Sequence, residues 1–207
     1  YLRRAVLQPA GMTDTAVTLG GWDDQRVARG LIDGQDQGRL DQFAGTPWWL
    51  LGAGGLQTTL ADMAAWTASL SAGSPLSAES VAAMTSVHAP SGEGDGAGMG
   101  YGFGVIPTPR GTTVIGHNGS NDVFAADWRH DLDDDLTVFV ASNHADVYAD
   151  VVSEAVWAMA LGARLELPPA VVVLEPDALA RRAGTWALED GARLVTRVRG
   201  SGLLVSS

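Results

Sequence analysis

Four short runs of strand-forming residues follow one another in the middle of the chain, and they constrain the fold more than any other feature. They span residues 101–106, 112–117, 123–130 and 136–143. Only a few residues connect one run to the next, whereas a crossover between parallel strands needs a dozen or more. The pattern therefore predicts that neighbouring strands pair antiparallel in one sheet.

Helical segments precede and follow these strands. Thr59 is a candidate N-cap, Asp62 is an acidic variant of the capping-box residue, and the apolar spacing that follows predicts a helix. Ser77 begins a second predicted helix, and residues 146–162 form a third with a broad apolar face. The predicted fold class is therefore α+β, an antiparallel sheet flanked by helices.

Two stretches lack a periodic pattern. Residues 21–50 are rich in Gly and Asp, and residues 89–100 are rich in Gly. We expect irregular structure in the first stretch and a loop in the second. The candidate anchors of the first stretch are large aromatic side chains: Trp22, Phe43, Trp48 and Trp49.

The organisation of the chain is expected to have three parts. Residues 1–165 form the main domain, residues 166–175 form a linker around Leu167-Pro168-Pro169, and residues 176–207 begin a small β-rich domain. This last part combines a short helix at 176–183 with strand-like runs at 185–188, 193–198 and 203–205. Residues 1–7 have the pattern of the tail of an amphipathic helix and no N-cap precedes them. The last strand-like run has no closing partner, so we expect an internal piece of a longer protein.

The charged residues exclude several classes of function. All 13 basic residues are arginine, there is no cysteine or lysine, and the formal net charge is −11. The chain therefore has no thiol nucleophile, no Schiff-base lysine and no Walker-type phosphate lysine. An acidic chain without a large basic patch is not expected to bind nucleic acid. No apolar run approaches the roughly 20 residues of a membrane-spanning helix.

Neither a metal nor a cofactor is predicted. Residues 131–135 resemble the start of a calcium loop, but the sixth position is Leu136 rather than Gly and the twelfth is Ser142 rather than Glu. We interpret this segment as a solvated hairpin turn. Residues 98–104 are rich in Gly, but their spacing does not match a dinucleotide fingerprint. No two histidines have the i, i+4 spacing of a helical metal site.

The candidate site lies at residues 116–120, where a strand rich in β-branched residues runs into Gly-His-Asn-Gly-Ser. Polar groups at a strand end, followed by glycine, can present side chains and a free backbone N–H to a cleft, as an oxyanion hole requires. The alternative is a β-turn with a surface histidine. The residues alone leave both interpretations open.

Six segments in order carry a resemblance to a known superfamily. They are Gln8-Pro9-Ala10-Gly11-Met12-Thr13-Asp14-Thr15, Ala28-Arg29-Gly30-Leu31, Ala53-Gly54-Gly55-Leu56 with Asp62, Tyr101-Gly102-Phe103-Gly104, His117-Asn118-Gly119 and Ser142-Asn143. The set resembles the serine β-lactamase and penicillin-binding-protein superfamily, in particular its branch of class C β-lactamases, D-alanyl-D-alanine carboxypeptidases and esterases. His117-Asn118-Gly119 matches the H-x-G form of the third catalytic motif.

The resemblance implies acyl transfer through a serine ester, on a small-molecule or peptide substrate. It places His117 and Asn118 along the substrate cleft, with Asn121 as a second substrate-binding residue. Gly119 would permit close approach of the substrate. The backbone N–H of Ser120 would donate to the oxyanion.

The chain departs from the superfamily in its nucleophile. Without lysine there is no S-x-x-K motif, and no tyrosine heads a Y-x-N motif. In the superfamily both motifs precede the point where this chain begins, so the resemblance implies that the N-terminal half of the same domain is missing. We therefore expect the 207-residue chain alone to be inactive.

Two functions remain open at this stage. The first is the C-terminal part of a serine hydrolase that acts on a β-lactam, a D-amino-acid peptide or a small ester. The second is a non-catalytic relative that binds such ligands or a partner protein. The resemblance also favours an extracytoplasmic location, since many relatives act on cell-wall peptides.

Overall fold

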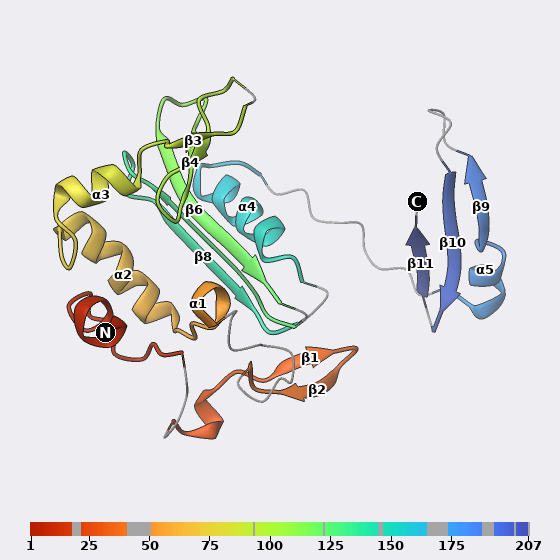
Figure 1. Ribbon diagram of the computed structural model, residues 1–207. Helices are drawn as coiled ribbons and strands as arrows, with labels where there is room; N and C mark the ends of the chain where they lie inside the picture. The colour runs from red at the N-terminus through yellow and green to blue at the C-terminus, as the bar shows by residue number, and fades with distance from the viewer. Residues whose placement is uncertain are drawn as a thin grey trace. The chain divides into compact units, whose positions relative to one another are not determined.

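The structure is a computed structural model (Figure 1). It describes residues 1–17, 22–40, 51–92, 94–121, 123–144, 147–164, 174–187, 193–200 and 202–206. The chain divides into two compact units, Tyr1–Leu165 and Glu166–Ser207. Phe43, Trp48, Trp49 and most of the expected linker lie outside the described residues.

A six-stranded antiparallel sheet forms the centre of the first unit, in the order β3-β4-β5-β6-β7-β8. The strands are β3 (Ala89–Pro90), β4 (Gly98–Met99), β5 (Gly104–Pro107), β6 (Thr113–Ser120), β7 (Ala125–Asp131) and β8 (Thr137–Ser142). Each strand pairs with its neighbour in sequence, as the short connections predicted. The predicted α+β class with an antiparallel sheet is confirmed.

The expected loop at residues 89–100 was wrong, because it contains β3 and β4. Each is only two residues long, so neither produces an alternating pattern in the sequence. The two strands pair antiparallel and their backbones lie so close that a Cβ on Gly98 would stand 2.4 Å from the carbonyl oxygen of Ala89.

Helices flank the sheet, and those at residues 60–72, 78–84 and 149–160 lie where the sequence predicted them. They are α1 (Leu51–Gly54), α2 (Leu60–Ala72), α3 (Ala78–Met84) and α4 (Ala149–Ala160), with a π-helical turn (η1, Arg3–Leu7) and a 3₁₀ turn (η2, Asp24–Arg26). The side chains of Thr59 and Ser77 cap α2 and α3 by accepting the amides of Asp62 and Ser80. The predicted N-cap at Thr59 and the predicted helix start at Ser77 are confirmed.

The carboxylate of Asp62 has a different partner from the one that a capping box predicts. It accepts the backbone N–H of Asp14 at 2.8 Å and the hydroxyl of Thr15 at 2.5 Å, and the Asp62 side chain is buried. The first turn of α2 is thereby fastened to the loop after η1. Two of the segments that carry the family resemblance are joined by these bonds.

Helices α2 and α4 lie on opposite faces of the sheet (Figure 1). Trp128 of β7 donates its ring N–H to the hydroxyl of Thr67 in α2, at 3.1 Å. The next residue, Arg129, reaches the other way and contacts the Asp150 carbonyl and the Glu154 carboxylate of α4. Successive strand residues point to opposite faces, so each face has its own helix.

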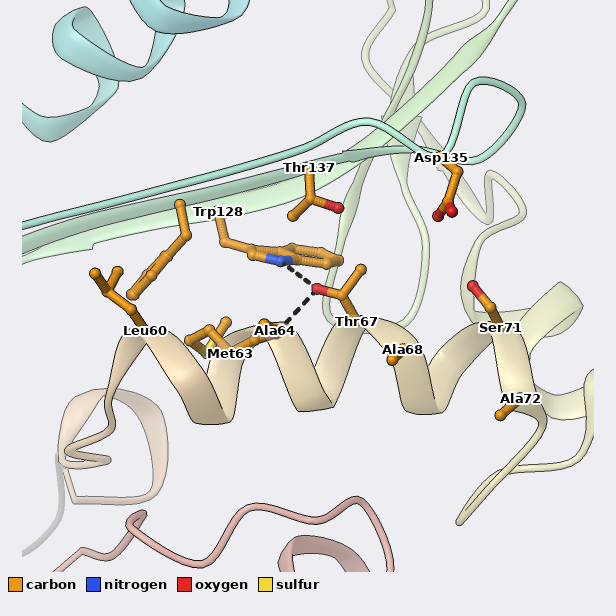
Figure 2. Close-up of a pocket in the computed structure, with 11 residues that line it drawn as sticks. Leu60, Met63, Ala64, Thr67, Ala68, Ser71, Ala72, Trp128, Asp135 and Thr137 are labelled. Carbon is orange, nitrogen blue, oxygen red and sulfur yellow. Dashed lines mark hydrogen bonds between the residues drawn. The ribbon is translucent and has the colours of Figure 1, made fainter.

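The main core fills the α2 face. Its buried members are Leu70, Phe103, Val105, Ile115 and Trp128. Beside it, the side chains leave a cavity of about 670 Å³ between α2 and strands β7 and β8. Figure 2 shows the indole of Trp128 in this cavity, above the Thr67 hydroxyl, which in turn donates to the Met63 carbonyl.

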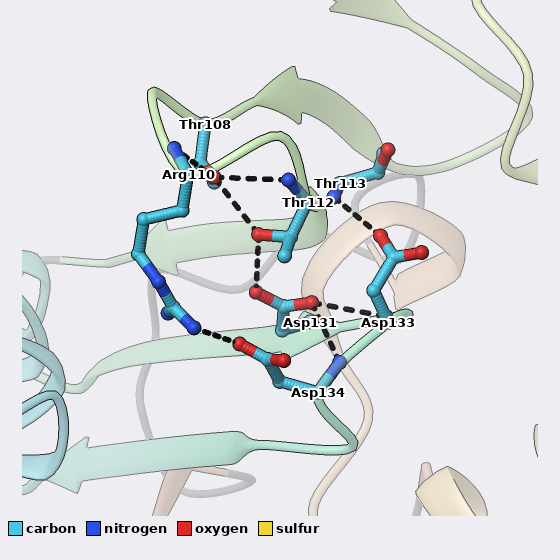
Figure 3. A network of polar contacts seen from close by, with 7 residues as sticks. All are labelled: Thr108, Arg110, Thr112, Thr113, Asp131, Asp133 and Asp134. Carbon is cyan, nitrogen blue, oxygen red and sulfur yellow. Dashed lines mark hydrogen bonds and ion pairs between the residues drawn. The ribbon is translucent and has the colours of Figure 1, made fainter.

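A hairpin turn joins β7 to β8 and is built around Asp131, which is 0% exposed (Figure 3). Its carboxylate accepts the amides of Asp133 and Asp134, each at 3.0 Å, and the hydroxyl of Thr112 at 2.7 Å. Arg110 forms an ion pair with Asp134. The carboxylate oxygens of Asp131 thus serve the turn itself. The predicted hairpin turn is confirmed, but Asp131 is buried in it rather than solvated.

Protonation of Asp131 is disfavoured in the folded state. Burial alone would raise the pKa of this carboxyl, but the Thr112 hydroxyl and the amides of Asp134 and Asp133 hold the pKa below its ordinary value of 3.8. A carboxyl with a lowered pKa in the folded state stabilises the fold above its ordinary pKa. That contribution disappears as the pH falls through the folded-state value.

Asp131→Ala is expected to lower the free energy of unfolding by about 1–3 kcal/mol at pH 7, because three partly buried donors lose their acceptor. Urea unfolding followed by circular dichroism measures the loss. Asp131→Asn is the matched control, because it keeps an acceptor oxygen without the charge. The difference between Asp131→Ala and the unmodified chain should shrink below about pH 4. A difference that grows on acidification would contradict the assignment.

Residues 30–38 form a hairpin, so the expected irregular structure at 21–50 was wrong there. Strands β1 (Gly30–Ile32) and β2 (Gln35–Gly38) pair antiparallel. Asp33 and Gly34 between them have φ angles of 49° and 74°. An Asp-Gly pair suits such a turn, but these strands are too short and polar to show a clear alternation.

The second unit contains α5 (Pro176–Ala180) and a three-stranded antiparallel sheet in the order β11-β10-β9. Its strands are β9 (Gly184–Ala187), β10 (Arg193–Arg199) and β11 (Gly202–Ser206). They occur where the strand-like runs were predicted. Within the described residues of both units, no helix combines the length and the apolar character that crossing a membrane would require.

Candidate functional site

The predicted site occupies the second half of β6. The strand continues through Ser120, whereas the sequence predicted that it would end at His117. Residues 117–120 are therefore strand rather than turn, and the alternative of a β-turn at the histidine was wrong. The turn comes later, between Asn121 and Phe124.

Beyond Gly116, β6 has a neighbour on one side only among the described residues. Pairing with β5 runs from Pro107↔Thr113 to Gly104↔Gly116, whereas pairing with β7 continues to Ser120↔Ala125. No described strand pairs with the backbone of residues 117–120 on the β5 side, and we call this side the open edge of β6.

The amide of Ser120 faces this open edge. The N–H of Asn121 bonds to the Phe124 carbonyl, on the β7 side, at 2.9 Å. The N–H and C=O of one residue in an antiparallel strand point to the same side, and the side alternates from residue to residue. The backbone groups of Asn118 and Ser120 therefore point away from β7. At the start of β6, the Thr113 carbonyl accepts the backbone N–H of Leu132 on the β7 side, which agrees with this alternation.

The side chains along β6 divide between the two faces of the sheet. Ile115 is 0% exposed in the core beside α2, so the alternation places His117 and Gly119 on that face and Asn118 and Ser120 on the α4 face. The exposed ring of His117 lies with Nδ1 at 2.6 Å from the Asn118 carbonyl oxygen. The side chains of His117 and Asn118 thus lie on opposite faces of the sheet, while the backbone N–H groups of Asn118 and Ser120 face the same open edge.

Asn121 holds the turn between β6 and β7. Its side-chain oxygen accepts the amides of Val123 and Phe124, at 3.0 and 2.7 Å. This is the Asx-type arrangement in which Asn closes a turn with its own side chain. Of the amide group, only the NH₂ end remains for the substrate contact that was predicted for this residue.

Two hollows border the end of β6 on the described surface. One of about 230 Å³ is lined by residues of the β6–β7 turn together with His144 and Tyr148. The other, of about 460 Å³, is lined by Asn118, Arg129 and Trp157 among others. No sequence pattern indicated Tyr148, because its position beside the turn depends on where α4 begins.

Among the described residues, the remaining histidines and acidic residues form no second centre. His130 is buried against Trp128, its Nδ1 lies 2.9 Å from the Thr137 hydroxyl oxygen, and burial lowers the pKa of its imidazole. His88 contacts the Ala83 carbonyl at 2.7 Å and stacks on Tyr101. In the described part of the chain, no three His, Asp or Glu side chains gather as metal ligands would.

Solved structures with the same fold include relatives with known names. The octameric penicillin-binding protein homologue from Pyrococcus abyssi superposes with a TM-score of 0.68 at 20% identity, over 99% of this chain and 47% of that one. The D-amino acid amidase from Ochrobactrum anthropi SV3, complexed with L-phenylalanine amide, gives 0.52 at 22% identity, over 74% and 47%. SurE with D-Leu gives 0.54 at 19% identity, over 98% and 48%.

The chain spans about half the length of each of these proteins. A search of curated proteins finds no match. Residues 1–162, which are most of the first compact unit, match the sequence pattern of the protein family described as Beta-lactamase. The chain therefore belongs to the β-lactamase family, within the superfamily of serine β-lactamases and penicillin-binding proteins.

Proposed function

We propose that this chain is the C-terminal part of a serine hydrolase that cleaves an amide or ester through an acyl-serine intermediate. The observation that carries the proposal is the open edge of β6, where the amide of Ser120 points outward at the end of the H-x-G motif. Membership of the β-lactamase family supplies the reaction type. The nucleophile would lie outside this chain, since the sequence has no lysine for an S-x-x-K motif.

The chemistry at this edge follows from the direction of the backbone groups. When a serine hydroxyl adds to the substrate carbonyl, the oxygen of that carbonyl becomes negatively charged. A fixed N–H at Ser120 would donate to this oxyanion without reorganising, a contribution worth about 3–4 kcal/mol per donor. The C=O and N–H of Asn118 on the same edge would pair with the backbone of an extended substrate.

The substrate classes that fit are a β-lactam, a D-amino-acid peptide and a small ester, which correspond to β-lactamase, carboxypeptidase and esterase activity. An extended D-amino-acid peptide would use the open edge most fully, because it can pair along the strand. For the parent protein we also propose an extracytoplasmic location, which cell fractionation of the producing organism tests.

The first test is covalent labelling with a fluorophosphonate and with a fluorescent penicillin. The 207-residue chain alone is expected to take up neither probe, whereas the full gene product takes up at least one. Serine labelling of the isolated chain would contradict the placement of the nucleophile outside it. Absence of labelling in both proteins would favour the second candidate, a non-catalytic ligand-binding relative.

A further inference from the structure

The turn that directly follows Ser120 packs against a segment outside the central sheet. Val123, in the connection between β6 and β7, is only 1% exposed. Its side chain lies directly against Gly30 of the β1 strand: a Cβ built on Gly30 would stand 2.1 Å from Cγ1 of Val123 and 3.3 Å from Cε2 of Phe124. The turn therefore packs directly on the backbone of Gly30, and no larger residue fits at this position unless Val123 moves.

The other side of the β1 strand is fastened to the end of β8. Asn143 donates its side-chain N–H to the Arg29 carbonyl at 2.7 Å, and its own carbonyl accepts the Leu31 amide at 2.8 Å. Leu31 also forms a parallel bridge with His144. The backbone on both sides of Gly30 is thus held by the two residues that directly follow β8, so it forms a fixed support.

The turn transmits the position of Val123 to Ser120 through short covalent and hydrogen-bonded links. The side-chain oxygen of Asn121 accepts the backbone N–H groups of Val123 and Phe124, and the backbone N–H of Asn121 donates to the Phe124 carbonyl. Ser120 directly precedes Asn121 and pairs with Ala125. A displacement of Val123 by an added methyl group would therefore move the end of β6.

We propose that Gly30 is a positioning residue for the oxyanion-binding amide of Ser120, acting through its contact with Val123. This inference rests on the proposed function for its catalytic meaning. The contact itself is testable apart from catalysis. It also assigns a role to the Ala-Arg-Gly-Leu segment at residues 28–31, which the resemblance identified only as a pattern.

The test compares Gly30→Ala with two other variants. Gly34→Ala is the matched control: Gly34 lies in the turn of the same hairpin, has a φ angle of 74°, and a Cβ there would meet nothing within 4 Å. That change strains the hairpin without pressing on Val123. The double variant Gly30→Ala/Val123→Ala removes the obstructing methyl groups and is the rescue.

In the full gene product, Gly30→Ala is expected to lower kcat for a chromogenic ester about 10- to 100-fold with little change in KM, since a misplacement of about 1 Å can cost that much. Affinity for an arylboronic acid, which forms a tetrahedral anion at the serine, should fall in parallel. The double variant should recover most of both losses, and Gly34→Ala should show neither. Equal losses in Gly34→Ala and Gly30→Ala would overturn the proposal, since hairpin stability would then explain them.

A second readout separates this inference from the proposed function. In ¹⁵N–¹H spectra of the 207-residue chain, Gly30→Ala should shift the amide resonances of Ser120 and Asn121, and Gly34→Ala should not. If the full gene product hydrolyses and binds none of the probes, the proposed function fails, while these shifts still decide the positioning role. Unshifted Ser120 and Asn121 resonances in Gly30→Ala would refute it whatever the activity.

Discussion

Ser120→Pro in the full gene product is expected to lower kcat about 100- to 1,000-fold, the cost of removing one oxyanion donor. Proline has no N–H, so the change deletes the proposed donor directly. The sheet should tolerate it, because the lost N–H faces the open edge rather than β7. Gly119 precedes the new proline and has no Cβ to collide with its ring. The measurement is kcat and KM for a chromogenic ester or β-lactam.

Ser120→Ala is the matched comparison, because it removes the hydroxyl and keeps the amide. Its loss of kcat should be far smaller than that of Ser120→Pro. Circular dichroism and urea unfolding show whether the proline variant keeps the fold. A folded Ser120→Pro variant with the kcat of the unmodified protein would exclude this amide as the donor.

Trp128→Ala is expected to lower the free energy of unfolding by about 3–5 kcal/mol, as large-to-small changes of buried aromatics do. The Trp128 side chain is 5% exposed, its ring centroid lies 5.4 Å from that of Phe103, and it bonds to Thr67. Such a loss is a large share of the 5–15 kcal/mol that stabilises a typical domain. Urea unfolding of the 207-residue chain measures it.

Trp157→Ala in α4 is the control for the loss of an indole as such. Trp157 is only half-buried, where it lines a hollow on the opposite face of the sheet. Trp157→Ala should lower the free energy of unfolding clearly less than Trp128→Ala does. An equal or larger cost would mean that the main core does not lie on the α2 face.

Much of the fold could be predicted because the signals are local. The caps at Thr59 and Ser77 depend on a side chain and an amide three residues away, so the sequence shows both partners together. The β1–β2 hairpin and the short strands β3 and β4 were missed for the opposite reason. Their pairing depends on backbone approach at Gly98 and on a turn at Asp33 and Gly34, and neither leaves an apolar alternation.

The candidate site was only partly predictable. The family motif located His117, Asn118, Gly119 and Ser120, but it did not show which of their backbone groups would face outward. Asn121 was expected to bind substrate, yet its side-chain oxygen closes the turn. Its partners are the amides of Val123 and Phe124, and whether they lie within reach depends on the conformation of the turn.

The sequence by itself determined the antiparallel order of the long strands, since the short connections allow no crossover, and it excluded an S-x-x-K nucleophile, since there is no lysine. Only the tertiary structure decided which amide is available at the end of β6. That depends on β5 stopping at Gly104↔Gly116 while β7 continues to Ser120↔Ala125. It also depends on Gly30 supporting Val123, a contact between residues far apart in the chain. The physical reason is that strand registry and packing are set by many distant contacts at once, and no local pattern encodes them.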